Sequence, residues 1–248
     1  MPAERHLRHP ILRAALAGMR QNLLPGAVLW CAALAIVLAY YVVPSLRPWF
    51  ERVEHAKQVG GFWFSAGSSA IAGALLPFLA MAALGRLPAR TRWSLLAFLL
   101  GLWIYRGMEV DAFYRLQAVL FGAGNDVATV VKKVAFDQFV YSALWTGPTS
   151  MLLYRWKDCG FSWSATRASL DRAFWRVQLP AVVISLWSVW IPAVSIIYCL
   201  PSSLQFPLFS LVLCFWVLLI EVVATRQDSG SPAASKDVSG KSGSLLES

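Results

Sequence analysis

Long apolar runs separated by short polar segments dominate the sequence. A helix needs about 20 mostly apolar residues to cross the roughly 30 Å hydrocarbon layer of a bilayer. Five runs reach this length, at residues 23–43, 61–84, 134–154, 179–200 and 204–224. The pattern predicts an all-α fold, a polytopic transmembrane helix bundle of five to six spans, whose membrane domain covers residues 23–224.

A sixth candidate span begins at Ser94 and is less regular. Its apolar core, "SLLAFLLGLWIY", is followed by Arg106, Glu109, Asp111 and Arg115. On a helix, Arg106 and Glu109 share a face with Gln117, while Asp111 and Arg115 lie on nearly the opposite face. Such a helix cannot lie wholly against lipid, so we expect it to be tilted, to emerge into the head groups, and to form local i,i+3 and i,i+4 ion pairs. Whether residues 94–121 fully span the membrane is left open.

The run at 179–200 contains Pro192, and a proline inside a helix removes one backbone hydrogen bond. We expect Ser185, Ser188 and Ser195 to compensate the carbonyl that Pro192 frees. The kink would either line a pore or fit a curved bundle. The short segment 201–203, "PSS", predicts a tight turn, so that the last two spans form a helical hairpin.

The composition supports a membrane protein. Of the 248 residues, 58% are hydrophobic and 14% are charged, whereas soluble domains carry about 25% charged residues. The net charge of +9 arises from Lys and Arg between the apolar runs. The distribution of these residues predicts that both termini lie on the inner side of the membrane. We expect the lipid bilayer as the partner, and anionic lipids in particular, because their head groups attract basic residues. We therefore expect no nucleic-acid partner.

The two ends of the chain differ from the membrane domain. Residues 1–22 form a basic flank, in which 10–21 have an amphipathic pattern with Ile11, Leu12, Ala15, Leu16 and Met19 on one side. This flank is either a transit peptide or interfacial anchor, or a basic segment that orients the first span. Residues 225–248 are rich in Gly and Ser, which predicts a disordered tail.

Two features inside the apolar runs suggest a function. Asp137 and Gln138 begin the run at 134–154, and an ionisable residue in a membrane segment is a functional candidate. Asp137 would belong to a cation pathway, pair with Lys133, or be solvated at the head groups. The run at 61–84 carries small residues at helical spacing, which favours helix packing or self-association into a homo-oligomer. These small residues are Ala66, Ser69, Ala70, Gly73 and Ala74.

Enzyme chemistry has little support in the sequence. The three histidines lie in charged segments, the four cysteines lack metal-ligand spacing, and no phosphate-binding loop or nucleophile motif is present. We therefore expect no enzyme activity, no catalytic or metal site, and no cofactor.

The second half of the chain resembles the Mpv-seventeen family, which includes the 22-kDa peroxisomal membrane protein. The residues that carry the resemblance are "KKVAFDQ" (132–138), the proline-containing run around Trp190 and Pro192, a last Trp-containing span, and "DAFYRLQ" (111–117) upstream. The resemblance covers residues 94–226. It departs from the family where Ile191 separates Trp190 from Pro192, and at Ser195 and Ile197-Tyr198, where the family has Gln and Asn-Phe.

This resemblance implies an integral multi-pass protein with pore activity. It would lie in the mitochondrial inner or peroxisomal membrane of a eukaryote, or in the plasma membrane of a bacterium. Our hypothesis is a channel for ions or small metabolites, and the alternative is a non-conducting membrane scaffold or interaction protein. The candidate pore or helix-packing residues are Arg106, Glu109, Asp137, Gln138, Trp190 and Pro192.

Overall fold

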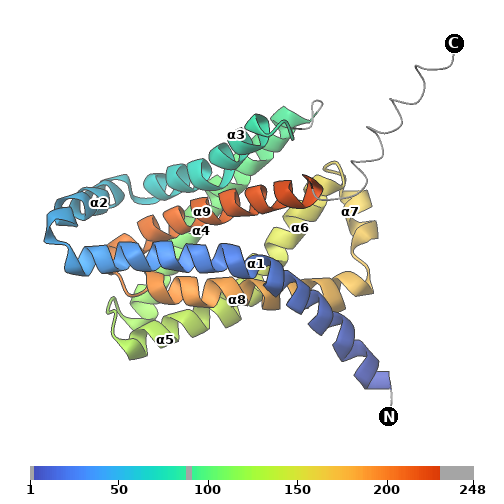
Figure 1. The fold of residues 1–248 in the computed structure, drawn as a ribbon, viewed down its shortest axis with the longest axis horizontal. Helices are drawn as coiled ribbons and strands as arrows, with labels where there is room; N and C mark the ends of the chain where they lie inside the picture. The colour runs from blue at the N-terminus through green and yellow to red at the C-terminus, as the bar shows by residue number, and fades with distance from the viewer. Residues whose placement is uncertain (1–2, 88–90, 230–248) are drawn as a thin grey trace, which may run out of the picture.

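The helices follow one another with short connections along the whole described chain (Figure 1). The structure, a computed structural model, describes the backbone of residues 3–87 and 91–229 and the side chains of 10–87 and 91–219. Within these residues the elements are α1 (Ala3–Val42), η1 (Pro44–Leu46), α2 (Arg47–Ala70), η2 (Ile71–Leu75), α3 (Leu76–Ala83), α4 (Arg92–Phe121), α5 (Val127–Ala135), η3 (Phe136–Thr146), α6 (Gly147–Asp158), α7 (Trp163–Ser169), η4 (Phe174–Gln178), α8 (Leu179–Ile197) and α9 (Ser202–Ser229). The all-α prediction is confirmed for this part of the chain.

Four helical stretches are long and apolar enough to cross a membrane, namely Pro10–Val42, Pro44–Ala83, Phe174–Ile197 and Ser202–Leu219. They contain most of the predicted spans 23–43, 61–84, 179–200 and 204–224. The predicted spans at 134–154 and from Ser94 are helical but do not belong to these four. The four helices fit an integral membrane protein, and the expected number of five to six spans is not confirmed.

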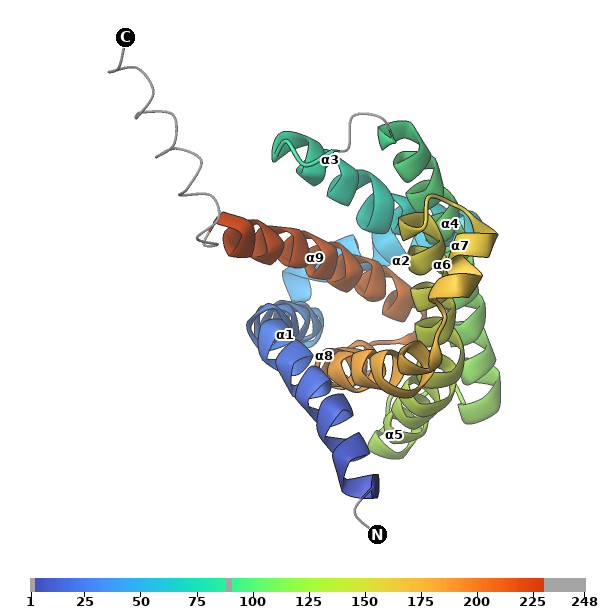
Figure 2. The same ribbon diagram turned by 90° about the vertical axis from the view of Figure 1, so that its right-hand side faces the viewer.

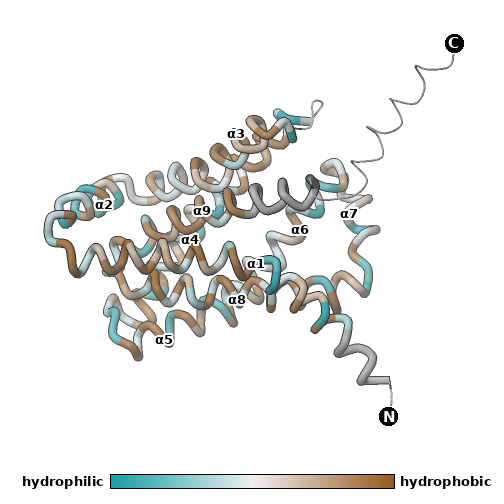
Figure 3. The backbone as a smooth tube through the Cα atoms, viewed as in Figure 1, coloured by the Kyte–Doolittle hydropathy of each residue, from teal (hydrophilic) through white to brown (hydrophobic). Residues whose placement is uncertain are grey.

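Apolar residues make up most of the length of the long helices (Figure 3). On α1, exposed leucine and valine side chains alternate with buried ones along the helix. The exposed ones include Leu23, Leu24, Val28, Leu34 and Leu38. A continuous exposed apolar surface is unfavourable in water but favourable against lipid chains. These side chains are therefore expected to face lipid.

Helices α1 and α8 lie side by side and run parallel. Gly18 faces Ser185, Gly26 faces Val189, and the indole N–H of Trp30 donates to the carbonyl of Val189 over 2.8 Å. A Cβ on Gly26 would lie 3.1 Å from a methyl of Val189, so glycine is what permits this close approach. Figure 2 shows α1, α8 and α9 on one side of the molecule and α4 and α6 on the other.

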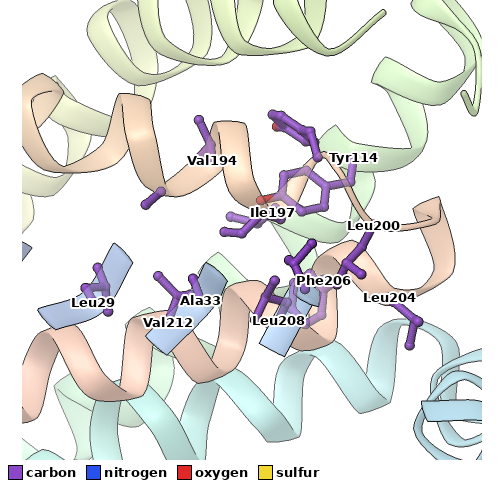
Figure 4. Close-up of a cluster of buried hydrophobic side chains, with 14 of the residues drawn as sticks. Leu29, Ala33, Tyr114, Val194, Ile197, Leu200, Leu204, Phe206, Leu208 and Val212 are labelled. Carbon is purple, nitrogen blue, oxygen red and sulfur yellow. The ribbon is translucent and has the colours of Figure 1, made fainter. Parts of the chain in front are cut away.

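The last two helices form the predicted hairpin. Helix α8 ends at Ile197, Pro201 lies in the turn, and α9 begins at Ser202. Leucine, valine and isoleucine side chains of both helices meet those of α1 in the main core, and Tyr114 reaches this core from α4 (Figure 4). Trp190 packs here against Phe209 and Trp216, at centroid distances of 6.0 and 6.2 Å.

Helices α2 and α4 form a close antiparallel pair. A Cβ on Gly107 would lie 2.3 Å from the backbone oxygen of Ser65, and one on Gly73 would lie 2.3 Å from the ring of Trp103. Ser69 and Ala74 of the small-residue ridge are fully buried. The helix-packing role predicted for the ridge is confirmed, and self-association of the chain stays a prediction.

Three segments have π-helical winding, and each is followed by a proline. Segments η2, η3 and η4 end at Leu75, Thr146 and Gln178, two residues before Pro77, Pro148 and Pro180. A proline cannot donate a hydrogen bond, and its ring clashes with the carbonyl four residues earlier. A wider turn before the proline relieves both effects.

Pro192 has no such segment, since α8 is helical on both sides of it. The serine hydroxyls do not donate to the carbonyl of Ser188, which Pro192 leaves without its helical hydrogen bond, so the expected compensation by serines is wrong. Ser188 Oγ donates to the carbonyl of Ser185 over 2.6 Å, and Ser195 Oγ donates to that of Ile191 over 2.7 Å. Trp30 bonds Val189, the residue after the freed carbonyl.

The predicted terminal regions differ from the structure in extent. Helix α1 is continuous from Ala3 to Val42, so the basic flank belongs to the same helix as the first apolar run, with a bend between them (Figure 1). Of the predicted apolar side of the flank, Ala15 is buried while Leu12 and Leu16 are exposed. Helix α9 continues to Ser229, past the predicted start of the tail, and residues 230–248 lie outside the described residues.

Candidate functional site: a buried polar seam beside helix α4

Helix α4 carries charges on both sides because both sides are covered by other helices. Towards α2, Asp111 is only 3% exposed and accepts hydrogen bonds from Lys57 Nζ at 2.7 Å and Ser65 Oγ at 2.9 Å. Arg115, one turn along α4, lies 3.3 Å from the same carboxylate. The expected i,i+4 pair of Asp111 with Arg115 is confirmed, and the carboxylate has a second, buried cation in Lys57.

A break in α2 places Lys57 for this contact. Gly61 has φ +51° and ψ −128°, a backbone conformation that favours glycine. Its carbonyl accepts from Lys57 Nζ over 3.1 Å and from Ser65 Oγ over 3.3 Å. The predicted beginning of a span at residue 61 coincides with this break.

On the opposite side of α4, Arg106 and Glu109 form the expected i,i+3 ion pair. Arg106 is 4% exposed, and its Nη1 lies 2.6 Å from Glu109 Oε2. Its Nη2 donates hydrogen bonds to Thr149 Oγ1 at 2.5 Å and to Ser150 Oγ at 3.1 Å. Glu109 also accepts a hydrogen bond from the indole of Trp145. These partners come from η3 and α6, so the pair joins α4 to the neighbouring helix.

Asp137 lies further along the same interface and is 6% exposed. Its carboxylate accepts hydrogen bonds from the Tyr198 hydroxyl and, over 2.9 Å, from Gln138 Nε2. Lys133 is buried too, but its Nζ donates to the carbonyl of Gly124 over 3.3 Å. The predicted Asp137–Lys133 pair and the predicted solvation at the head groups are both wrong, and the hydrogen bonds to Asp137 come from neutral donors.

These groups form a polar seam between α4 and the α5–η3–α6 helix, in which the ring of Phe113 stacks on Tyr141 between the two ends. The polar seam consists of Arg106, Glu109, Gln117, Lys133, Asp137, Gln138, Tyr141, Thr146, Thr149, Ser150 and, from the end of α8, Tyr198. Along α4 it extends from Arg106 to Gln117, about 17 Å at 1.5 Å per residue. One end reaches the exposed loop at Gly124, and the other reaches a cleft that Arg106 and Thr149 line.

Most of the buried polar atoms without a hydrogen-bond partner lie on this seam. Of the eight such side-chain atoms in the described part of the chain, five belong to it. They are Arg106 Nε, Gln117 Oε1, Gln138 Oε1, Tyr141 Oη and Thr146 Oγ1. The Tyr141 hydroxyl faces Thr146, but the two do not form a well-aligned hydrogen bond. An unpaired buried polar atom costs about 1–3 kcal/mol, so a row of them is a site that water or a polar solute would satisfy.

The π-helical winding of η3 keeps the seam on one face. In an α-helix, Thr146 would point about 180° away from Asp137, nine residues earlier, at 100° per residue. A π turn closes i→i+5 bonds and takes roughly 4.4 residues, so nine residues make about two full turns. Segment η3 covers Phe136–Thr146, and this winding brings Thr146 and Asp137 to the same side, towards α4.

The structure brings together four of the six predicted site residues. Arg106, Glu109, Asp137 and Gln138 lie on the seam, whereas Trp190 and Pro192 belong to the contacts of α8 with α9 and α1. Tyr198 was missed, and nothing in its sequence context distinguishes it. Gln117 carried a signal, since it shares a helical face with Arg106 and Glu109.

The seam combines a carboxylate that is held by neutral donors with a row of unpartnered polar atoms. Among the described residues there is no group of three or more His, Cys, Asp or Glu side chains that could hold a metal. A carboxylate that is bonded only by neutral donors leaves negative charge for a mobile cation to balance. Asp137 is such a carboxylate.

No family model, no curated protein and no solved structure matches this chain. Its function is therefore inferred from its own residues.

Proposed function

We propose that this protein is a membrane channel for small cations or small polar solutes, and that the pathway follows the polar seam. The observation that carries the proposal is the row of five buried, unpartnered polar atoms, from Gln117 to Arg106, beside four helices that are long and apolar enough to span a membrane. Water in these positions would hydrate a route between the loop at Gly124 and the cleft at Arg106.

Asp137 would set the selectivity of the pathway. It lies between the two ends of the seam, and rings or points of acidic charge favour cations. The basic residues Lys133 and Arg106 lie towards the ends, where Lys133 bonds a backbone carbonyl and Arg106 is balanced by Glu109. Two charges of the proposed pathway therefore have no ion-pair partner within the described residues, Lys133 at its loop end and Asp137 between its ends, and Asp137 is the one that would attract a cation.

The resemblance to the Mpv-seventeen family is compatible with this proposal. Two of the segments that carry the resemblance, 111–117 and 132–138, contribute Gln117, Lys133, Asp137 and Gln138 to the seam. We propose a distant relationship on this basis, with the expected organelle or bacterial membrane unchanged. The scaffold alternative is less well supported, because its small-residue ridge is buried inside the chain.

The experiment is a recording of purified protein in planar bilayers of neutral lipid. We expect conductance in the wild type and a fall in the cation-to-anion permeability ratio of about tenfold or more in Asp137→Asn. A charge acting over ~6 Å at an effective dielectric constant of ~20 contributes more than the 1.4 kcal/mol that a factor of ten requires.

Two control variants make the test specific. Asp158→Asn removes a carboxylate whose side chain is 62% exposed on α6, and Pro192→Ala changes a residue away from the seam. Both are expected to conduct like the wild type. A silent bilayer at high protein load, or a wild-type permeability ratio in Asp137→Asn, would contradict the proposal.

A further inference from the structure

A large cleft lies where the polar seam ends at Arg106. Its volume is about 1070 Å³, and it is lined by α4, α6, α7 and the segment that leads to η4. Its lining includes Arg106, Thr149, Leu153, Arg167, Leu170 and Trp175. Binding sites for small molecules commonly measure about 300–1,000 Å³. The cleft therefore has room for a polar head group together with part of an acyl chain.

Two arginines line the cleft. Arg106 is nine-tenths buried or more, and its Nε has no hydrogen-bond partner although Glu109 and Thr149 occupy its other nitrogens. Arg167 is in the last turn of α7, and no ion pair within the described residues involves it. Guanidinium groups match phosphate oxygens in geometry and charge. The lining of the cleft therefore includes one buried guanidinium with an unused donor and one guanidinium that no ion pair within the described residues balances.

The other wall of the cleft is apolar and rich in tryptophan. Leu153, Leu170 and Trp175 line it, and Trp163 stacks on Trp156 with a centroid distance of 5.0 Å and an interplanar angle of 17°. Trp163 and Trp175 are 65% and 45% exposed. Tryptophan with this exposure is typical of the boundary between lipid chains and head groups. An anion without an acyl chain would leave this wall uncovered.

We propose that the cleft binds one anionic phospholipid, with its phosphate on Arg106 and Arg167 and an acyl chain against Leu153, Leu170 and Trp175. The flanking segment supports this choice, because residues 155–176 carry five Lys or Arg and two Asp, and basic pockets at membrane boundaries bind anionic head groups. The site does not depend on conduction: a protein that conducts nothing would still bind the lipid.

The experiment is a lipid titration of the full-length, detergent-solubilised protein, followed by native mass spectrometry. The probes are phosphatidylglycerol, which is anionic, phosphatidylcholine, which is zwitterionic, and inorganic phosphate. We expect one phosphatidylglycerol to bind more tightly than phosphatidylcholine. We expect Arg167→Gln to weaken this binding about tenfold, because it removes a charged hydrogen-bond donor to the phosphate.

The matched control is Arg172→Gln, since Arg172 is an exposed arginine in the same basic segment that does not line the cleft. It is expected to change the affinity less than twofold. If both variants weakened phosphatidylglycerol binding equally, the lipid would be held by diffuse charge attraction and not by this site, which would overturn the proposal. Equal binding of phosphatidylcholine, or displacement of the lipid by millimolar phosphate, would overturn it as well.

Folding of the variants is checked by thermal unfolding in the same detergent. Arg167 is exposed at the end of a short helix, so its replacement should leave the melting temperature unchanged. If Arg167→Gln did not fold, Arg167→Lys would keep the charge and lose the two-pronged geometry. An affinity like that of the wild type in Arg167→Lys would then show that no guanidinium site exists.

Discussion

On the side of α4 that packs against α2, Asp111 is held by Lys57, Ser65 and Arg115, and Gly107 lets the two backbones approach closely. On the opposite side, Asp137 is 6% exposed, against 3% for Asp111, yet its hydrogen bonds come from a tyrosine and a glutamine. Five unpartnered polar atoms accompany it, whereas only Ser69 Oγ and Trp103 Nε1 are unpartnered at the α2 contact.

This difference separates two uses of a buried acidic residue. A carboxylate that is matched by a buried cation contributes to packing and is part of a contact without space for solvent. A carboxylate with neutral donors and unsatisfied neighbours keeps capacity for another species. The degree of burial does not distinguish these two kinds of carboxylate, whereas the charge of their hydrogen-bond partners does.

The largest effect is expected at Asp111. Asp111→Asn would leave Lys57 buried without its counter-charge, which typically costs about 3–5 kcal/mol. Unfolding of the detergent-solubilised protein should show this loss. Replacing both residues with apolar ones, Lys57→Met with Asp111→Leu, should recover most of the stability. If Asp137→Asn destabilised the protein as much as Asp111→Asn does, the distinction between the two sides would fail.

A smaller loss is expected at Gly107. Gly107→Ala would place a Cβ 2.3 Å from the Ser65 carbonyl oxygen, so the α2 and α4 backbones would have to separate. Overpacking of this kind costs about 1–3 kcal/mol, measurable as a lower melting temperature. Gly101→Ala is the matched control on the same helix, because nothing lies within 4 Å of its Cβ. Equal melting temperatures for the two variants would refute a tight α2–α4 contact.

Two buried hydroxyls without partners, one on each side of α4, sharpen the comparison further. Thr146→Val should destabilise the protein by about 1 kcal/mol, because a hydrated seam would lose a hydrogen bond to water. Ser69→Ala, at the dry α2 contact, should be neutral or slightly stabilising because it removes an unsatisfied group. Chemical unfolding of both variants measures the difference, and a stabilising Thr146→Val would indicate a dry seam.

The smallest effect concerns Asp126, which caps α5 near the loop end of the seam. Hydrogen bonds from the side chain and backbone N–H of Thr129 lower the pKa of Asp126 below its ordinary value of 3.8. The contribution of this cap to stability is therefore complete above the ordinary value and is lost as the pH falls through the lower value in the folded protein. Asp126→Asn keeps a capping oxygen that does not titrate, so only the wild type should lose this contribution in melting curves recorded from pH 5 to pH 2.

Hydropathy was sufficient to predict the apolar helices of this fold. The helices at 61–84 and 179–200 are predicted by the hydropathy of their side chains alone. The helical spacing of the charged residues in α4 also predicted two local ion pairs, Arg106 with Glu109 and Asp111 with Arg115. Lys57 as the partner of Asp111 was not predictable, because the contact joins residues far apart in the sequence. The same holds for Tyr198 and Asp137.

The π-helical segment η3 was also beyond prediction, although Pro148 was visible in the sequence. The proline indicates that the helix must deform, but the direction and extent of the deformation depend on which neighbours pack against it. On a regular α-helix Thr146 would lie opposite Asp137, and only the winding of Phe136–Thr146 places it on the seam.

That winding has a consequence for the length of the chain. In the stretch from Phe136 to Thr146, each turn holds about one residue more than an α turn. Deleting a single residue there would let one wide turn tighten to an α turn, so the segments on either side would keep their relative orientation, whereas inserting a residue would rotate them by about a quarter of a revolution relative to each other. Insertions in these residues should therefore be tolerated far less than single deletions or changes of side chain.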